Sequence, residues 1–276
     1  MKPLDQFPAS EKKRIKYVLT DIDDTLTIDG CLPAVAFTAL ERLKTAGIAV
    51  IPITGRPAGW CDHIARMWPV DAVVGENGAF YFRYDKTRKK MIRRYWKSET
   101  QRTEDRIKFH ALQQAILERV PGCRVSSDQA YREADLAIDF CEDVPPLSMS
   151  SVDKIVDLFH QAGAQAKVSS IHVNGWFGEY NKLAMTQRLF RECFRTQPDE
   201  MTAASIFVGD SPNDEPMFAA FPHAVGVANI CNYTNQMVNK PAWVTKNRGG
   251  YGFAEMVDVL IGSDPVSNGK SRGCHE

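Results

Sequence analysis

Three carboxylates lie close together in the chain, directly after an apolar run. Asp21, Asp23 and Asp24 follow residues 15–20, whose β-branched and apolar composition predicts a buried strand. Carboxylates this close repel one another, and the repulsion costs free energy unless a cation or a proton relieves it. Such a group can serve catalysis on a charged substrate, but an acidic turn that caps the next helix would contain the same residues. These acids alone do not decide between the two interpretations.

A second polar motif follows the next expected strand, at residues 49–53. The motif reads Thr54-Gly55-Arg56-Pro57. It combines a hydroxyl with a glycine that allows close backbone approach and a proline that suits the first turn of a helix. Free amides at a helix start, together with a hydroxyl, bind anions such as phosphate. The alternative is a plain strand-to-helix turn in which a hydroxyl caps the helix.

Two further motifs occur in the second half of the chain. Lys182 opens an expected helix, where its charge opposes the helix dipole unless the ammonium group faces an anion. A solvated surface lysine is the alternative. After the apolar run 205–208 the chain supplies Asp210, Asn213 and Asp214. Carboxylate and amide oxygens are hard ligands that suit Mg²⁺, although Asp214 is also placed to cap the next helix.

The elements that would position these residues alternate between strands and helices. The expected strands cover residues 15–20, 49–53, 72–74, 205–208, 224–227 and 243–244, and the expected helices cover 33–45, 58–67, 215–220 and 251–261. This alternation predicts an α/β fold, a Rossmann-like parallel sheet covered by helices on both faces. In such sheets the functional crevice lies beyond the carboxyl ends of the strands, where the motifs are expected.

The middle of the chain has a different pattern. A hairpin is expected at 79–84 and 90–96, followed by helices at 104–119 and 151–162 and by short strands at 123–125, 136–140, 165–169 and 171–173. We therefore predict that residues 1–82 plus 178–264 form the core domain and that 83–177 form an inserted α+β cap domain. The polar tail, 265–276, is expected to be disordered.

Composition narrows the function classes. The 276 residues are 44% hydrophobic and 25% charged, and 34 Lys plus Arg balance 34 Asp plus Glu. This balance favours neither nucleic acid nor an anionic membrane as a partner, and the basic residues between 86 and 94 are typical of a solvated hairpin. The polar N-terminus predicts no signal peptide, and we find no apolar run of the roughly 20 residues that a membrane span needs. Its seven cysteines form no CxxC pair, so we expect reduced thiols and a cytoplasmic location. Nothing in the sequence specifies an oligomeric state.

The four motifs together resemble those of the haloacid dehalogenase superfamily. They read DxDxT at 21–25, Thr-Gly-Arg at 54–56, a lysine at 182 and GDxxND at 209–214. The segment Gly-Glu-Asn-Gly-Ala at 75–79 adds a likeness to the Cof-like and sucrose-phosphatase-like branch, subfamily IIB. In that branch an α/β cap is inserted at this place in the chain.

The resemblance implies roles for the acids. Asp21 stands at the position of the nucleophile that forms an aspartyl-phosphate, and Asp23 stands at that of the general acid and base. Asp21, the carbonyl of Asp23 and Asp210 would bind Mg²⁺. Of Asn213 and Asp214, one would orient the metal shell and the other would hold the lysine. Asp24 occupies a position where many relatives carry glycine, a departure that touches the loop rather than the nucleophile.

The resemblance also implies how the substrate is held. Thr54 would donate its hydroxyl to the phosphate and Lys182 would neutralise its charge, with Gly55, Arg56 and Asn77 completing the substrate site. The cap would close over the cleft and choose the substrate. His172 lies close to the expected boundary of the cap, where it could touch a leaving group, although a packed imidazole is the favoured interpretation.

The resulting hypothesis is Mg²⁺-dependent hydrolysis of a small phosphomonoester, a sugar phosphate or a related metabolite. A sugar phosphomutase of the same superfamily would carry the same four motifs. A non-catalytic sugar-phosphate sensor is the third interpretation, against which the general acid at Asp23 speaks, because binding alone does not require it.

Overall fold

The computed structural model describes residues 1–169 and 171–263, so the tail whose disorder we predicted lies outside the described residues. The chain divides into two compact units. The first contains Met1–Val50 and Thr202–Glu276, and the second contains Ile51–Met201. The boundaries that we predicted for the cap, near 83 and 177, fall within the second unit and stay a prediction.

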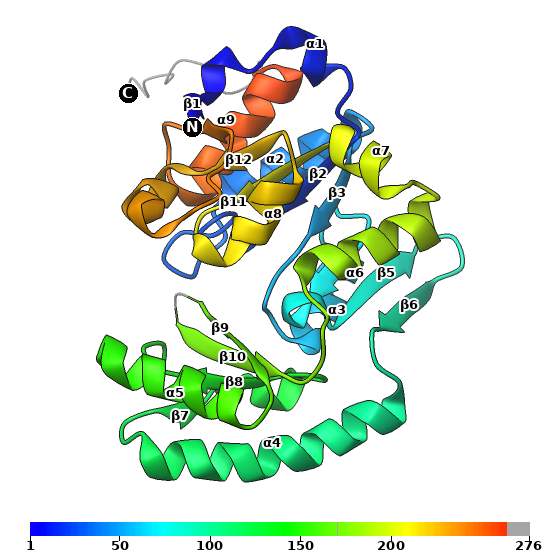
Figure 1. Cartoon of the computed structure of the whole chain (residues 1–276). Helices are drawn as coiled ribbons and strands as arrows, with labels where there is room; N and C mark the ends of the chain where they lie inside the picture. The colour runs from blue at the N-terminus through cyan, green and yellow to red at the C-terminus, as the bar shows by residue number, and fades with distance from the viewer. Residues whose placement is uncertain (170, 264–276) are drawn as a thin grey trace, which may run out of the picture. The chain divides into compact units, whose positions relative to one another are not determined.

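The first unit is built on a six-stranded sheet with the order β1-β13-β12-β11-β2-β3 (Figure 1). Its strands are β1 (Lys2–Pro3), β2 (Tyr17–Thr20), β3 (Ala49–Pro52), β11 (Ser205–Gly209), β12 (Ala224–Gly226) and β13 (Trp243–Val244). The β1–β13, β12–β13, β11–β12 and β2–β11 pairs are all parallel. Every residue of the central strand β11 is buried, as expected for a strand covered on both faces.

The helices of the first unit include α2 (Ala34–Thr45) and α9 (Gly249–Ile261), which pack against each other, and α8 (Glu215–Ala220). An ion pair of 2.6 Å joins Arg42 of α2 to Asp258 of α9. Shorter elements are α1 (Ala9–Lys12) and the 3-10 segments η1 (Leu4–Gln6), η5 (Pro212–Asp214) and η6 (Ala228–Gln236). Helix α7 (Pro198–Ala203) contains the boundary between the units.

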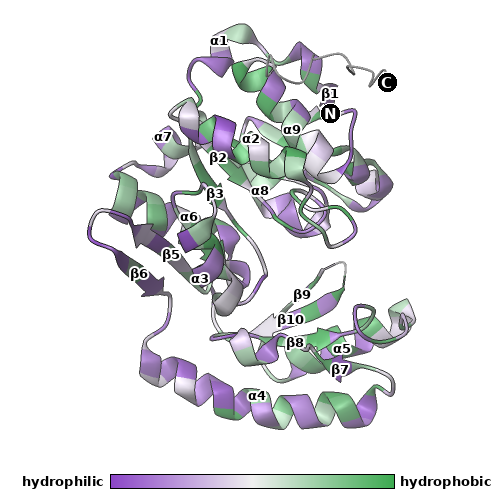
Figure 2. Ribbon diagram, turned by 180° about the vertical axis from the view of Figure 1, so that it is seen from behind, coloured by the Kyte–Doolittle hydropathy of each residue, from purple (hydrophilic) through white to green (hydrophobic). Residues whose placement is uncertain are grey.

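The second unit holds two antiparallel sheets. The smaller sheet consists of β4 (Val73–Gly75), β5 (Phe80–Asp85) and β6 (Lys90–Tyr95). Helices α3 (Ala58–Met67) and α6 (Lys182–Leu189) pack against it, and a π-helical turn η4 (Phe190–Phe194) continues α6. Strand β6 is largely hydrophilic (Figure 2).

The larger sheet has the order β7-β8-β10-β9, formed by β7 (Arg124–Val125), β8 (Leu136–Asp139), β9 (Gln165–Val168) and β10 (His172–Trp176). Helices α4 (Glu99–Arg119) and α5 (Met149–Gln161) enclose a hydrophobic core with one face of this sheet (Figure 1). The core includes Ile138 and Val173, so the side chains that alternate with them, His172 and Asn174 among them, belong to the other face.

The predicted α/β fold with a parallel sheet is confirmed, and so is the hairpin formed by β5 and β6. One strand was assigned to the wrong sheet. We expected residues 72–74 in the parallel sheet, but β4 pairs with β5 in the antiparallel sheet and keeps one parallel bridge, between Ile53 and Val74. Helix α4 also begins five residues earlier than expected, because Ser98 and Gln101 form a capping box.

Among the described residues, no helix combines the length and the apolar character that crossing a membrane requires. The six described cysteines are free thiols.

Candidate active site

In the first unit, three acids converge at the carboxyl ends of two neighbouring strands. Asp21 follows β2 and Asp210 follows β11, and the backbone amide of Asp21 donates to the carbonyl of Val208, 2.9 Å away. Asp214 completes a group whose oxygen atoms all lie within 4.8 Å of one another. The three residues are 4%, 6% and 0% exposed, in the order given. Adjacency of the parallel strands thus brings together acids 189 residues apart.

The loop after β2 turns sharply so that its acids stay at the sheet edge. Asp24 has a φ of 54°, in the left-handed region that glycine adopts most easily and that Asp tolerates. Its amide donates to the Thr27 hydroxyl, 3.0 Å away. This conformation explains why Asp24 can stand where many relatives have glycine. Helix α2 begins only at Ala34, with Pro33 at its N-cap, so the acids of this loop do not cap it.

Asp214 occupies the N-cap position of α8, but its side chain makes no capping hydrogen bond to that helix. Its Oδ2 instead accepts from the backbone amide of Asp210, at 3.2 Å. A Cβ atom at Gly209 would lie 2.4 Å from the same oxygen. Gly209 is therefore required for Asp214 to fold back onto the acid group, and the capping alternative for Asp214 does not hold.

Two residues to which our sequence reasoning gave no role hold Asp210. The hydroxyl of Thr25 donates to Asp210 Oδ1 at 3.3 Å, and the amide of Asn229 donates to Asp210 Oδ2 at 3.3 Å. Asn229 also donates to the carbonyl of Asp24 at 3.0 Å and accepts from the amide of Gly249 at 3.1 Å. One side chain thus joins the two acidic loops to the start of α9. Asn229 lies three residues beyond β12, so a search for polar residues past every strand end would have found it.

The donor set of this group fits a hard divalent cation. Three carboxylates with converging oxygens offer the ligands that Mg²⁺ prefers, and their mutual repulsion falls when a cation binds. Asp23 is half-buried two residues beyond Asp21, where its carbonyl remains a predicted ligand, and Asn213 is half-buried in η5.

In the second unit, several hydrogen bonds hold the loop that contains Thr54 in place. Thr54 is fully buried; its amide donates to the carbonyl of Val74 at 2.9 Å, and its carbonyl accepts from the amide of Asn77 at 3.1 Å. The Arg56 amide donates to Thr54 Oγ1 at 3.0 Å. A hydroxyl that accepts one hydrogen bond still has its own hydrogen to donate to a ligand. The N-cap of α3 is Pro57, so Thr54 does not cap the helix.

Two close approaches bring Asn77 and Lys182 to this loop. A Cβ atom at Gly55 would lie 3.3 Å from the side-chain amide nitrogen of Asn77, so the amide sits directly over the glycine. At Gly78 a Cβ would lie 2.2 Å from the carbonyl oxygen of Asn181, the N-cap of α6. The start of α6, and with it Lys182, therefore packs on the turn that contains Asn77. Lys182 is 7% exposed, so the solvated alternative does not hold.

The start of α3 is not open to an anion in the way that we expected. Its first amide, that of Ala58, donates to Oε1 of Glu76 at 2.9 Å. Glu76 is fully buried, with a φ of 42°, and it also accepts from the amides of Glu133 at 2.9 Å and Ala134 at 2.6 Å. Burial raises the pKa of Glu76 to about 8. The acceptor at this helix start is therefore the carboxyl group of Glu76, which follows β4 directly, and not an external anion.

The Arg56 side chain contacts Trp60 of α3 and Glu142, which lies in the segment after β8. Its guanidinium lies 4.5 Å from the centre of the Trp60 ring and 3.9 Å from Glu142 Oε1. Glu142 Oε2 is 2.8 Å from Nε2 of His172, although the orientation is not that of a hydrogen bond. His172 is 3% exposed, and burial lowers its pKa to about 4. It is a buried imidazole in contact with an acid that is one-third exposed.

The predicted site residues thus fall into two groups. Asp21, Asp23, Asp210, Asn213 and Asp214 belong to the first unit, and Thr54, Gly55, Arg56, Asn77 and Lys182 belong to the second. Each group is assembled within its own unit from segments distant in the sequence. The catalytic and binding roles of these residues stay predictions.

Comparison with known proteins agrees with this architecture. Residues 18–135 match the haloacid dehalogenase-like hydrolase family. A search of curated proteins found no match. Among solved structures, a Thermoplasma acidophilum protein is 18% identical with a TM-score of 0.68, covering 89% of this chain and 98% of that one.

Two structures of stated activity are also similar. The sucrose-phosphatase of Synechocystis, solved with sucrose and phosphate, is 16% identical with a TM-score of 0.61, covering 88% of this chain and 97% of that one. A subclass IIB sugar phosphatase of the same superfamily is 14% identical with a TM-score of 0.57, covering 83% and 93%. Residues 18–135 thus match the haloacid dehalogenase-like hydrolase family, and the chain shares its fold with these solved structures.

Proposed function

We propose that the chain is a Mg²⁺-dependent phosphatase that hydrolyses a small phosphomonoester, a sugar phosphate or related metabolite, through an aspartyl-phosphate on Asp21. The observation that carries the proposal is the convergence of Asp21, Asp210 and Asp214 at the ends of β2 and β11. The matched family and the sugar phosphatases among the similar structures support it.

The proposed reaction has two steps. A carboxylate oxygen of Asp21 attacks phosphorus, the bond to the leaving oxygen breaks, and Asp23 gives that oxygen its proton. Asp23 then takes a proton from a water molecule, which attacks phosphorus and breaks the bond to Asp21. Inorganic phosphate leaves and Asp21 is restored.

The remaining residues would bind the phosphoryl group and neutralise its charge. Asp21, Asp210 and the carbonyl of Asp23 would hold Mg²⁺, which supplies positive charge that neutralises the phosphoryl oxygens. Thr54 would donate its hydroxyl to a phosphoryl oxygen, and the Lys182 ammonium would balance the charge that spreads over these oxygens in a loose transition state. Arg56, beside Glu142 and His172, would contact the leaving group.

The test is phosphate release from a panel of phosphorylated metabolites, with Mg²⁺ and with EDTA. We expect turnover only with metal and without any bisphosphate activator, which a mutase would require. Asp21→Asn should lower kcat by at least about 10³-fold while remaining folded, because an amide is no nucleophile here. The matched control is Asp29→Asn, the same change at a largely exposed position, which should retain activity. Activity in Asp21→Asn close to that of the wild type would refute the assignment.

A further inference from the structure

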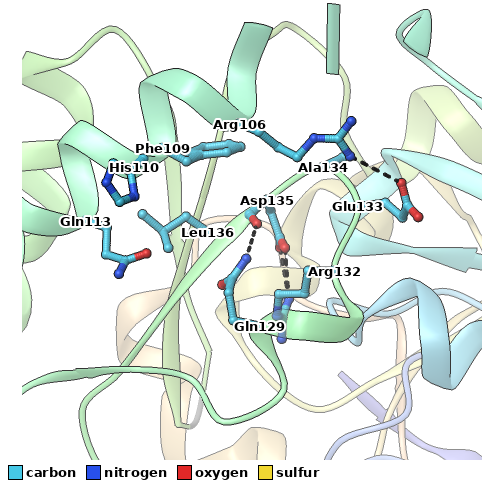
Figure 3. A pocket seen from close by; sticks show the side chains of 10 residues that line it. All are labelled: Arg106, Phe109, His110, Gln113, Gln129, Arg132, Glu133, Ala134, Asp135 and Leu136. Atoms are coloured by element: carbon cyan, nitrogen blue, oxygen red, sulfur yellow. Dashed lines mark hydrogen bonds and ion pairs between the residues drawn. The ribbon is translucent and has the colours of Figure 1, made fainter. Parts of the chain in front are cut away.

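Arg132 is a buried arginine that is distant along the sequence from every motif described above. It lies between η3 (Gln129–Tyr131) and β8, and its side chain is 1% exposed. Its Nε and Nη2 bond the two carboxylate oxygens of Asp128 at 2.9 and 3.0 Å. Its Nη1 bonds Asp135 at 3.0 and 3.1 Å (Figure 3). The planar guanidinium group of Arg132 is therefore held by an acid on each side, and these bonds fix its orientation.

The same Nη1 makes one contact outside the larger sheet and its loops. It donates to the carbonyl oxygen of Gly55, at 3.1 Å. This carbonyl belongs to the peptide between Gly55 and Arg56, whose N–H donates to Thr54 Oγ1 at 3.0 Å. Because a trans peptide is planar, its C=O and N–H point in opposite directions and turn together. A bond that holds the carbonyl therefore also aims the N–H at the Thr54 hydroxyl.

Glu76 keeps the segment around Arg132 against this loop. Its carboxylate accepts from the amide of Ala58 in α3 and from the amides of Glu133 and Ala134, the two residues after Arg132. Tyr131 packs on the same helix, since a Cβ at Gly59 would lie 3.0 Å from that of Tyr131. The loop and the Arg132 segment are thus joined at several points. Among these contacts, the Arg132 hydrogen bond is the one that ends on the Gly55–Arg56 peptide.

We propose that Arg132 is a positioning residue for phosphate binding, which sets the direction of the Thr54 hydroxyl through the Gly55–Arg56 peptide. The inference rests on the proposed function. Arg132 touches neither the phosphate nor the leaving group in this scheme. With Nη1 in place, the Thr54 oxygen accepts from Arg56 and its hydrogen points away toward the phosphoryl group. Without it, the peptide can rotate and the hydroxyl loses its fixed direction.

The test is a double-mutant cycle between Arg132→Lys and Thr54→Val. Lysine keeps the charge but cannot bond both acids and the Gly55 carbonyl, and valine removes the hydroxyl while keeping the shape. Arg132→Lys should lower kcat/KM by roughly tenfold or more, and in the Thr54→Val background by less than about twofold. The change should appear in KM and in inhibition by inorganic phosphate more than in kcat, because the hydroxyl contacts the phosphoryl group from binding onward. Additive losses in the two backgrounds would overturn the proposal.

Asp105→Asn is the matched control. It breaks another ion pair with a buried acid, the 2.6 Å contact with Lys97, which does not touch the Thr54 loop, and its effect should add to that of Thr54→Val. Should Arg132→Lys not fold, the triple variant Arg132→Gln/Asp128→Asn/Asp135→Asn removes all three charges and enters the same cycle.

A second readout does not depend on activity. Hydrogen exchange of the Arg56 amide should be faster in Arg132→Lys than in the wild type, while the Ala58 amide, bonded to Glu76, should change less. An unchanged Arg56 exchange rate would overturn the inference even if the enzyme is active. A wild-type protein that releases no phosphate but shows the exchange effect would instead refute the proposed function and leave the positioning contact standing.

Discussion

The two units each bury a cluster of acids, and the clusters differ in what their oxygens face. In the first unit, the oxygens of Asp21, Asp210 and Asp214 converge on one another. In the second, Asp128 and Asp135 converge on the guanidinium of Arg132. The donors that hold Asp210 include the neutral side chains of Thr25 and Asn229, whereas the donor between Asp128 and Asp135 is a cation of the chain.

This difference distinguishes acids that face one another from acids that face a cation of the chain. Acids that surround their own arginine already face a cation of the chain, although burial still raises the pKa of Asp135. Burial alone would raise the pKa of Asp128, but Arg132 reverses that effect and holds it below its ordinary value. Acids that point toward one another gain most when a cation is added from outside. The first cluster should therefore respond to Mg²⁺ and the second should not.

The largest expected effect is the loss of the cation from the second cluster. Arg132→Met should lower the free energy of unfolding by about 3–5 kcal/mol, because two acids would stay buried without their cation. In the first cluster, Asp210→Asn should cost less than about 1 kcal/mol in metal-free protein, since it relieves repulsion. Urea unfolding in EDTA measures both. Similar losses in the two variants would remove the distinction between the clusters.

The buried His172 of the larger sheet makes the protein sensitive to acid. His172 has a pKa lowered from 6.5 to about 4, by burial first and then by Arg132, while Asp128 and Asp139 act in the other direction. Below pH 6.5 the unfolded chain gains a proton that the folded protein does not, so stability falls as pH drops from 6.5 toward 4. This difference in pKa corresponds to a loss of up to roughly 3 kcal/mol.

Unfolding measured at intervals over this pH range checks the effect. His172→Gln should flatten the dependence by removing the titrating group. His160→Gln, a change at an exposed histidine of α5, is the control and should leave the dependence as it is. A His172→Gln variant with the same acid sensitivity as the wild type would show that other groups carry it.

The smallest expected effect tests how the first cluster is held. Asn229→Ala removes the bonds to Asp210 and to the Asp24 carbonyl, and it should weaken Mg²⁺ binding by roughly tenfold without abolishing it. Calorimetric titration gives the affinity, and the rise in melting temperature with Mg²⁺ should shrink in parallel. Asn235→Ala, at an exposed position of the same segment, is the control. Equal affinities in the two variants would show that Asn229 does not orient the metal ligand.

Much of the first cluster was predictable because strand ends have a simple geometry. Asp21 and Asp210 each follow a short apolar run, and parallel neighbours place such residues at one edge of a sheet. Asn229 follows a strand too, but it lies three residues beyond the strand end and inside a 3-10 segment. At that distance, the position of a residue in the sequence does not show which way its side chain points. Strand β4 was assigned to the wrong sheet because three apolar residues fit either a parallel or an antiparallel partner.

The sequence by itself determined the α/β class, the four motifs and the order in which they occur, because these depend on local periodicity and on residues at strand ends. Only the tertiary structure decided which acids face one another and which face a cation of the chain. It placed Glu76 at the start of α3, where we had expected an external anion, and it placed Arg132 against Gly55. These contacts join a side chain to a backbone group 18 and 77 residues away, and no pattern along one segment encodes them.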